Sequence, residues 1–330
     1  MTPKHFFSRI LNGLVGLLSG EIVFRLITRR VICIVVYHDV TKTPYPFSQR
    51  HNLNVPPALF ETQIGFIKHY FTIISPQQLV DGGYATPAAL ITFDDGFAGF
   101  FDNALPILER LHCPSLLCLN MAPVAGEVFW SGLLAYLYDT DKKFIEYLTA
   151  SRGRQVDSFL QCTPEDVAGY LASGWVDREK VDQMARHYYG PFATHEHLAR
   201  IEQGFGVALG NHSYRHYNAV TLSPEALQRE YWENEQALAQ YSNKIEIFSY
   251  PFGQPDTCLN TETHRVLRNA GARVLLYSSG GVMWRTKGSL WNRIGMSEQI
   301  TDEKKFRRMI VRSILIQPLK GFIRFLSGPR

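Results

Sequence analysis

The chain has 330 residues, of which 45% are hydrophobic and 19% charged, and its formal net charge is +4. This composition is that of a folded globular protein and excludes a disordered or collagen-like chain. Because the charge is small and no basic run is interleaved with aromatic residues, we expect no nucleic-acid partner.

Residues 1–30 combine basic residues with an apolar stretch at 10–18. Arg9, Glu21 and Arg25 interrupt the apolar character, so no span of about 20 apolar residues exists to cross a bilayer. No small-residue cleavage site of a secretory signal precedes Glu21. We expect a basic amphipathic segment that either packs on the domain or lies on an anionic membrane surface as a peripheral contact.

Apolar, β-branched runs alternate with helical patterns through the middle of the chain, residues 31–300, which we expect to form the main domain. The predicted strands cover residues 31–37 (VICIVVY), 90–93, 115–120, 205–209, 245–250 and 272–277, and the predicted helices 106–111, 224–241 and 261–270. This alternation predicts an α/β fold with a parallel sheet, either open or closed into a barrel.

Two segments depart from this alternation. Residues from about 123 to 200 are helical and rich in aromatic and charged residues, with no clear strand, and we predict a helical insertion there. Residues 301–330 resemble the N-terminal segment and predict a basic amphipathic helix with the same two alternatives, packing on the domain or membrane contact.

The five cysteines form no CxxC pair, and three of them stand in apolar runs. We therefore expect buried free thiols in a reducing compartment rather than a disulfide framework. This favours a location in the cytoplasm or at the inner face of the membrane, with an extracytoplasmic location left open.

Polar residues follow four of the predicted strands, at His38–Asp39, Asp94–Asp95, 211–216 and 249–253. Functional groups of parallel α/β folds gather where strands end, so these residues are expected to meet on one rim. His212 and His216 are four residues apart, which in a helical turn places both imidazoles on one face. Two histidines with one aspartate form a common divalent-metal site, and the second aspartate would stay free to take a proton from water.

The sequences TFDDG (92–96) and HSYRH (212–216) resemble the first two motifs of the polysaccharide deacetylase family, the NodB-homology proteins of carbohydrate esterase family 4. The runs YHDV (37–40) and SYPFG (249–253) resemble further family features in the same chain order. The resemblance implies a distorted (β/α) barrel, here with a helical insertion, and metal-dependent removal of N-acetyl groups from an amino sugar. The partner would be an N-acetylated glycan or a lipid-linked sugar of the cell envelope.

By motif position, the resemblance makes Asp94 the general base and Asp95, His212 and His216 the ligands of a divalent metal, Zn²⁺ in most relatives. It also places Tyr250, Pro251 and Phe252 beside the substrate, with the backbone of Tyr250 or Phe252 facing the oxyanion. Two positions depart from the family pattern. The third motif begins with Ser249 where an arginine that orients the base is usual, and no histidine follows His264 to act as the late general acid.

Arg293 is our candidate for the missing orienting arginine, because a guanidinium stays protonated and cannot serve as the acid. His38 is the candidate acid; it could instead hydrogen-bond to the site from outside, and Asp94 could serve as base and then as acid. Tyr217, Trp130 and Trp284 could form a sugar-stacking surface or belong to the core. Two other functions remain open: an O-acetyl esterase or different amidase on the same scaffold, and a catalytically silent carbohydrate-binding relative.

Overall fold

The computed structural model describes residues 3–204, 206–284 and 288–327. Seven parallel strands close into a barrel, because β1 pairs with β9 on one side and with β3 on the other. The barrel strands, in their order around it, are β1 (Val31–Tyr37), β3 (Ala88–Asp95), β4 (Ser115–Leu119), β5 (Val207–Asn211), β6 (Lys244–Ser249), β7 (Val274–Ser278) and β9 (Leu290–Gly295). The predicted (β/α) barrel is confirmed.

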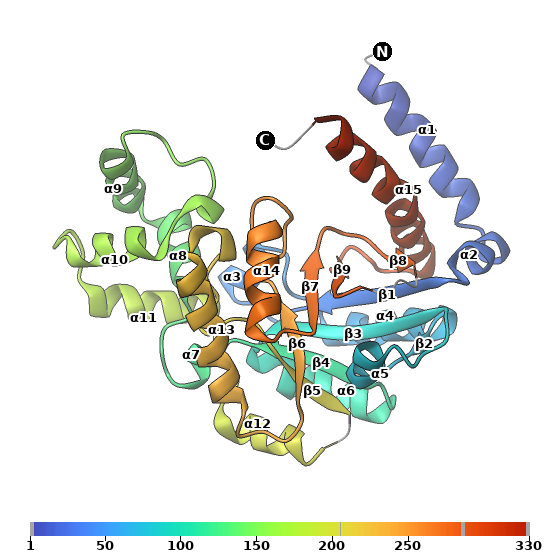
Figure 1. Cartoon of the computed structure of the whole chain (residues 1–330), viewed down its shortest axis with the longest axis horizontal. Coiled ribbons are helices and arrows are strands. Elements are labelled where there is room, and N and C mark those ends of the chain that lie inside the picture. The colour runs from blue at the N-terminus through green and yellow to red at the C-terminus, as the bar shows by residue number, and fades with distance from the viewer. Residues whose placement is uncertain (1–2, 205, 285–287, 328–330) are drawn as a thin grey trace.

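Two short strands extend the barrel sheet: β2 (Thr72–Ile73) pairs with β3, and β8 (Met283–Trp284) runs antiparallel to β1. Figure 1 shows the helices arranged around the barrel. Those outside the predicted insertion are α3 (Pro46–Arg50), α4 (Pro57–Tyr70), α5 (Pro76–Asp81), α6 (Leu105–Arg110), α13 (Pro224–Leu238) and α14 (Thr261–Ala270), with a π-helix at Phe100–Ala104 and a 3-10 helix at Ala219–Thr221.

Every residue of β1 and β3 is buried, which explains why these strands read as continuous apolar runs in the sequence. The sequence patterns missed β9, because its central residues Asn292 and Arg293 are polar and yet fully buried. The strand predicted for 205–209 starts at Val207 in the structure; its first residue, Phe205, lies outside the described residues.

The strand pairing brings the polar residues of the sequence to one rim. Asp95 is level with Leu119 of β4, which is level with Asn211 of β5, so His212 follows directly at the same height. Across β7 and β9, Ser278 is level with Arg293. The carboxyl ends of the strands therefore surround one opening of the barrel, as in other (β/α) barrels.

The segment between β4 and β5 contains a helical subdomain with its own hydrophobic core, in which Leu134, Phe144 and Tyr170 are fully buried. Its elements are α7 (Met121–Val124), α8 (Trp130–Thr140), α9 (Lys142–Arg152), a 3-10 helix at Phe159–Gln161, α10 (Pro164–Ala172) and α11 (Arg178–Tyr189). Helix α12 (His195–Glu202) also falls in the predicted insertion, but it buries Leu198 and Ile201 in the barrel's main core. Figure 1 shows α8–α11 standing out to one side of the barrel.

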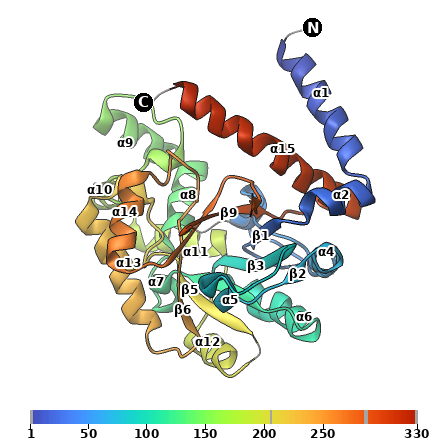
Figure 2. The same ribbon diagram turned by 45° about the vertical axis from the view of Figure 1, so that its right-hand side comes forward.

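The terminal helices α1 (Pro3–Leu18), α2 (Glu21–Thr28) and α15 (Glu303–Ser327) lie together beside β1 (Figures 1 and 2). Helix α15 packs Phe306, Ile310 and Val311 into the main core. Helices α1 and α2 bury far less and leave six large apolar side chains exposed: Ile10, Leu14, Leu17, Ile22, Val23 and Leu26. Residues 1–2 and 328–330 of the predicted terminal segments lie outside the described residues.

Within the described ranges, no single helix is both long and apolar enough to span a membrane. Only α1 and α2 taken together reach the required length and composition, and they are bent by 92° where they meet. All five cysteines are free and buried, as the sequence predicted.

Candidate active site

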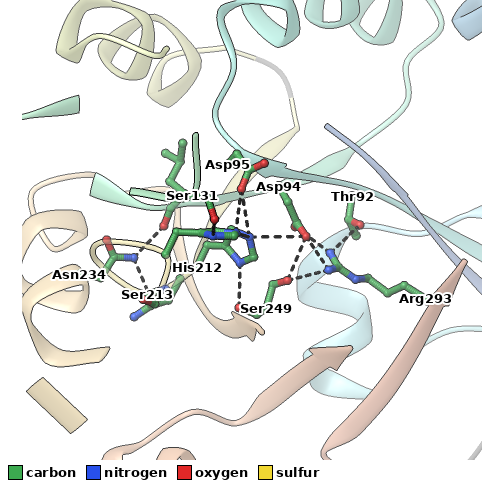
Figure 3. A network of polar contacts seen from close by, with 12 residues as sticks. Thr92, Asp94, Asp95, Ser131, His212, Ser213, Asn234, Ser249 and Arg293 are labelled. Atoms are coloured by element: carbon green, nitrogen blue, oxygen red, sulfur yellow. Dashed lines mark hydrogen bonds and ion pairs between the residues drawn. The ribbon is translucent and has the colours of Figure 1, made fainter. Parts of the chain in front are cut away.

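The two adjacent carboxylates at the end of β3 reach the same point, although consecutive residues of a strand normally face opposite sides. Asp95 leaves the strand with a φ of +71°, which turns its side chain toward the barrel opening. Gly96 follows with a φ of +96°, and a Cβ on it would stand 2.4 Å from Leu119 Cδ2, so only glycine fits there. As a result, Asp94 Oδ2 and Asp95 Oδ1 lie 3.8 and 3.4 Å from the same atom, His212 Nε2 (Figure 3).

Asp95, His212 and His216 form a triangle of potential ligand atoms. The Nε2 atoms of His212 and His216 are 3.1 Å apart, and Asp95 Oδ1 lies 3.4 and 3.1 Å from them respectively. Ligands at about 2.0–2.1 Å from a tetrahedral zinc ion stand about 3.3 Å from one another. The triangle therefore fits one face of a tetrahedral site and leaves a further position open.

Each of the two imidazoles makes a hydrogen-bond contact through Nδ1 and faces the triangle with Nε2. His212 Nδ1 lies 2.9 Å from the Ser249 carbonyl oxygen, which can only accept, so Nδ1 carries the proton. His216 Nδ1 lies 2.7 Å from Ser131 Oγ. Asp95 Oδ1 is buried and has no hydrogen-bond donor among the described residues. Two imidazole Nε2 atoms and an unpartnered carboxylate oxygen that converge in a buried site fit a bound cation.

The second carboxylate, Asp94, is held in a different way. Arg293 Nη1 donates to Asp94 Oδ1 at 2.8 Å and Nη2 donates to Oδ2 at 2.6 Å, a bidentate pair that is almost completely buried. Ser249 Oγ also donates to Oδ2, at 3.2 Å. Burial alone would raise the pKa of Asp94, but the charge of Arg293, helped by His212, outweighs it and lowers the pKa below its usual value.

The pKa of Asp95 lies well below its usual value, because the nearby His216 and His212 outweigh the effect of burial. Both carboxylates are therefore ionised at neutral pH. Asp95 has one carboxylate oxygen without a hydrogen-bond donor, as a metal ligand requires. Asp94 is held by the Arg293 guanidinium and can accept a proton from a water molecule between the two carboxylates.

The motif HSYRH is a loop in the structure, not the helical turn that the spacing of its histidines predicted. Ser213 and His216 have positive φ values, 64° and 63°, which no helix allows. The buried carboxylate of Glu230 holds this loop, since it accepts hydrogen bonds from Ser213 Oγ at 3.1 Å and from the Arg215 N–H at 2.8 Å. By this irregular path the loop brings the Nε2 atoms of His212 and His216 within 3.1 Å of each other, and Figure 3 shows His212 pointing toward Asp95.

The triangle and Asp94 open into a cavity of about 340 Å³. Its walls come partly from the barrel and partly from the inserted subdomain, which contributes Phe129, Ser131 and Phe159. Phe129 and Phe252 both pack edge-on against His216, with ring centroids 5.5 and 4.9 Å away. The aromatic wall limits access of water to one side of the site and leaves a pocket large enough for a small polar group such as an acetamide.

His38 also lines this cavity, so the structure brings the candidate acid to the site. Burial lowers its pKa, partly offset by the charges of Asp95 and Asp94. Its neighbour Asp39 turns away and accepts a hydrogen bond from Ser48 Oγ at 3.2 Å, which organises the loop after β1.

The predicted substrate residues of the third motif divide into two groups. The backbone N–H of Tyr250 donates to the Leu276 carbonyl at 3.0 Å and is not available for an oxyanion, which corrects that half of the prediction. Pro251 accepts from the Gly253 N–H at 2.7 Å, which closes a γ-turn around Phe252 with its φ of +59°. The Phe252 N–H has no partner within the described residues and borders the cavity, so it is the donor that remains.

The three aromatic residues of the predicted sugar-stacking surface do not all lie together. Tyr217 is not among the residues that line the cavity, and its ring packs edge-on against Trp130 at 5.0 Å as part of the subdomain core. Trp284 pairs with Val31 at the amino end of β1, which is the opposite end of the barrel. Aromatic density in the sequence could not separate these core positions from a binding surface.

Ser131 is a site residue that the sequence did not indicate. It stands at the start of α8, 85 residues before the histidine that it contacts, and no local motif marks it. The sequence offered one indirect indication of such a residue, because the large insertion follows β4, a neighbour of the strands that carry the motifs.

Residues 155–275 match the model of a known family, described as polysaccharide deacetylase. This range contains His212, His216 and the third motif, whereas Asp94 and Asp95 precede it. No curated protein sequence matches the chain.

Solved structures share the fold. A Streptococcus pyogenes deacetylase, PplD, in complex with acetate is 16% identical with a TM-score of 0.57, and the alignment covers 86% of this chain and 99% of that one. IcaB from Ammonifex degensii is 15% identical, with a TM-score of 0.54 and coverage of 85% and 97%. A de-N-acetylase from Aggregatibacter actinomycetemcomitans is 16% identical, with a TM-score of 0.54 and coverage of 85% and 100%. The family match over residues 155–275 agrees with the resemblance predicted from the motifs, and the solved deacetylase structures share the fold of this chain.

Proposed function

We propose that the protein removes N-acetyl groups from an amino sugar of a cell-envelope polysaccharide or glycolipid, with Zn²⁺ held by Asp95, His212 and His216. The observation that carries this proposal is the pairing of an unshared ligand triangle with a fixed carboxylate. Asp94 Oδ2 lies 3.8 Å from His212 Nε2, so a water beside the triangle is within reach of Asp94.

When bound, the zinc ion would supply a Lewis acid that lowers the pKa of a coordinated water. The protein's own groups carry out the rest. Asp94 accepts a proton from the attacking water, and Arg293 keeps both carboxylate oxygens in place while it does so. The Phe252 N–H would donate to the oxygen of the acetyl carbonyl as negative charge develops there.

The sugar amine leaves with a proton, and two groups are positioned to supply it. Asp94 can return the proton that it took from water, since it borders the same cavity throughout the reaction. His38 is the alternative donor from the end of β1. A His38→Gln variant that loses about 10²-fold in kcat would assign the proton to His38, and one within threefold of the wild type would assign it to Asp94.

The test of the proposed function is acetate release from N-acetylglucosamine oligomers by the zinc-loaded protein. We expect Asp94→Asn to lower kcat about 10³-fold, because the amide cannot accept the proton, while the exposed control Asp102→Asn stays near the wild type. Equal acetate release by wild type and Asp94→Asn would refute the mechanism. Release only from O-acetyl esters would identify an esterase, and sugar binding without any release would identify a silent relative.

Metal dependence is tested separately by elemental analysis. We expect one zinc ion per chain, lost in His212→Ala, and activity that disappears on chelation and returns with added zinc. A wild-type protein that retains full activity after complete removal of divalent metals would rule out the metal role.

We also propose that the protein associates peripherally with an anionic membrane surface through α1 and α2. Their exposed apolar residues include Leu17 and Ile22, at 73% and 78% exposure. Arg9 and Arg25 stand exposed on the same helices, and Arg29 and Arg30 stand exposed directly after α2. Apolar side chains with adjacent cations are the features that bind such surfaces.

Vesicles that contain anionic phospholipid test this association. We expect the wild type to sediment with them and a Leu17→Asp/Ile22→Asp variant to remain in solution. Met184→Asp, at an exposed apolar position on α11, serves as the control. If the wild type does not sediment, the association does not occur.

A further inference from the structure

A second hollow lies beside the catalytic cavity, between α1, α15 and the ends of β7 and β9. Its volume is about 910 Å³, and we call it the basic groove because Lys305, Arg308 and Arg312 of α15 line it. No aspartate or glutamate is among its described lining residues. A groove lined with three cations and no acid favours an anionic ligand.

The cations of the basic groove have fewer protein partners than Arg307, the neighbouring arginine on α15. Arg307 points to the packed side of α15 and is fully engaged, with its Nη1 3.2 Å from Glu303 Oε1 and its Nε donating to the Ser19 carbonyl at 2.8 Å. Arg308 and Arg312 are exposed, one helical turn apart, and have no ion pair within the described residues. Lys305 Nζ donates to Thr301 Oγ1 at 2.8 Å and lies 3.9 Å from an exposed carboxylate oxygen, Asp302 Oδ2. These guanidinium groups are therefore available to a ligand.

The basic groove adjoins the catalytic cavity at the end of β9. Gly295 lines both hollows, and a Cβ built on it meets no atom within 4 Å, so no side chain separates them there. At the end of β7, Ser278 faces the cavity and the next residue, Ser279, faces the groove. A sugar with its acetamide at the ligand triangle can thus extend a substituent over Gly295 toward Arg308.

We infer that the basic groove binds a phosphate or diphosphate ester carried by the N-acetylated sugar. Guanidinium groups bind phosphate oxygens in bidentate fashion, and the lysine adds a third positive charge. Helix α1 contributes Asn12 and Val15 to the same groove, which places the helix of the proposed membrane contact beside the anionic end of the substrate. The inference rests on the proposed function for the acetamide end of the substrate and adds the anionic end.

Binding to the zinc-loaded Asp94→Asn protein tests the inference without turnover. By calorimetry, we expect N-acetylglucosamine 1-phosphate and UDP-N-acetylglucosamine to bind at least tenfold more tightly than N-acetylglucosamine. Adding Arg308→Gln and Arg312→Gln should remove this preference, since the charge-assisted hydrogen bonds are lost. The control pair Arg200→Gln and Arg229→Gln, exposed on α12 and α13, should retain it. Equal affinity for phosphorylated and neutral sugars in the parent protein would overturn the inference.

In the active enzyme, the same two substitutions should raise KM for the phosphorylated sugar about tenfold and leave its kcat within twofold. A second arm uses anionic vesicles: if Arg308→Gln/Arg312→Gln loses vesicle binding but keeps the preference for sugar phosphates, the groove binds lipid headgroups and the inference is wrong. Acetate release from neutral oligomers is measured alongside, so failure of the deacetylase function is seen separately from failure of the anion site.

Discussion

The catalytic cavity and the basic groove meet at Gly295, but the charged residues of the cavity are buried and paired, whereas those of the groove are exposed. In the cavity, Asp94 and Arg293 are 3% and 1% exposed and satisfy each other. In the groove, Arg308 and Arg312 stand in solvent. Buried charges interact strongly and are costly to leave unpaired, whereas exposed charges are screened by salt and contribute little to folding.

The contrast suggests a division of labour. The cavity fixes the groups that carry out the chemistry, where small displacements matter, and the groove selects the substrate through charges that fold without a partner. Substitutions in the cavity should therefore reduce both catalysis and stability, and changes in the groove should alter only the choice of substrate.

The largest effect is expected for Arg293→Gln. It leaves the buried carboxylate of Asp94 without its cation, so we expect a loss of about 3–5 kcal/mol in the free energy of unfolding and about 10² in kcat. Arg293→Lys keeps the positive charge but not the bidentate geometry, so its stability and kcat should lie between those of the wild type and of Arg293→Gln. Urea unfolding and acetate release measure both effects. Arg273→Gln, which breaks an exposed pair with Glu246, should change neither, and similar losses there would erase the contrast.

The second-largest effect concerns the pH dependence of stability and the buried carboxyl of Asp39. This residue follows His38 at the end of β1 and has no cationic partner among the described residues. Burial raises its pKa to about 6, although Ser48 donates a hydrogen bond to it. Between its unfolded pKa of about 3.9 and about 6, the folded state keeps a proton that the unfolded state has released. This group therefore lowers stability as pH rises through that window.

Asparagine cannot ionise, so the stability of Asp39→Asn relative to the wild type should increase by up to about 3 kcal/mol between pH 4 and pH 7. Urea unfolding across this range measures the difference. The exposed control Asp157→Asn should show no such trend, and a flat difference for Asp39→Asn would mean that its charge is compensated in the folded protein.

Ser131→Ala tests the contribution of the inserted subdomain to the metal site. The variant removes the partner of His216 Nδ1, and we expect zinc affinity to fall about tenfold with little change in kcat at saturating zinc. Competition with a fluorescent chelator measures the affinity. Unchanged affinity would show that the subdomain only covers the site. Ser151→Ala, on α9 of the same subdomain, is the matched control.

The smallest effect is expected from salt. Raising the ionic strength from 0.05 to 0.5 M should increase KM for a phosphorylated sugar about fivefold, because exposed charges are screened over a few ångströms. KM for the neutral sugar should not respond, since the charges of the cavity are buried. If salt raises both KM values equally, the exposed charges of the groove do not contribute to the selection of phosphorylated sugars.

The sequence predicted the barrel strands that are uniformly apolar, and the two motifs that form the site. It could not show that Asp95 leaves its strand with a positive φ, or that the HSYRH motif is a loop held by Glu230. It left open whether Tyr217 belongs to the core or to a binding surface, since periodicity does not distinguish a core aromatic residue from one in a pocket. Ser131 escaped because its role depends on contact across 85 residues of chain.

What the sequence determined by itself is chemical: two carboxylates and two imidazoles at strand ends, a serine where relatives place arginine, and basic amphipathic termini. The tertiary structure decided which groups meet. Barrel closure brings β9 beside β1 and carries Arg293 to Asp94 across 199 residues, which replaces the arginine missing at Ser249. Spacing along the chain carries no information on such contacts, because they arise only when strands pair in register and the buried charges need partners.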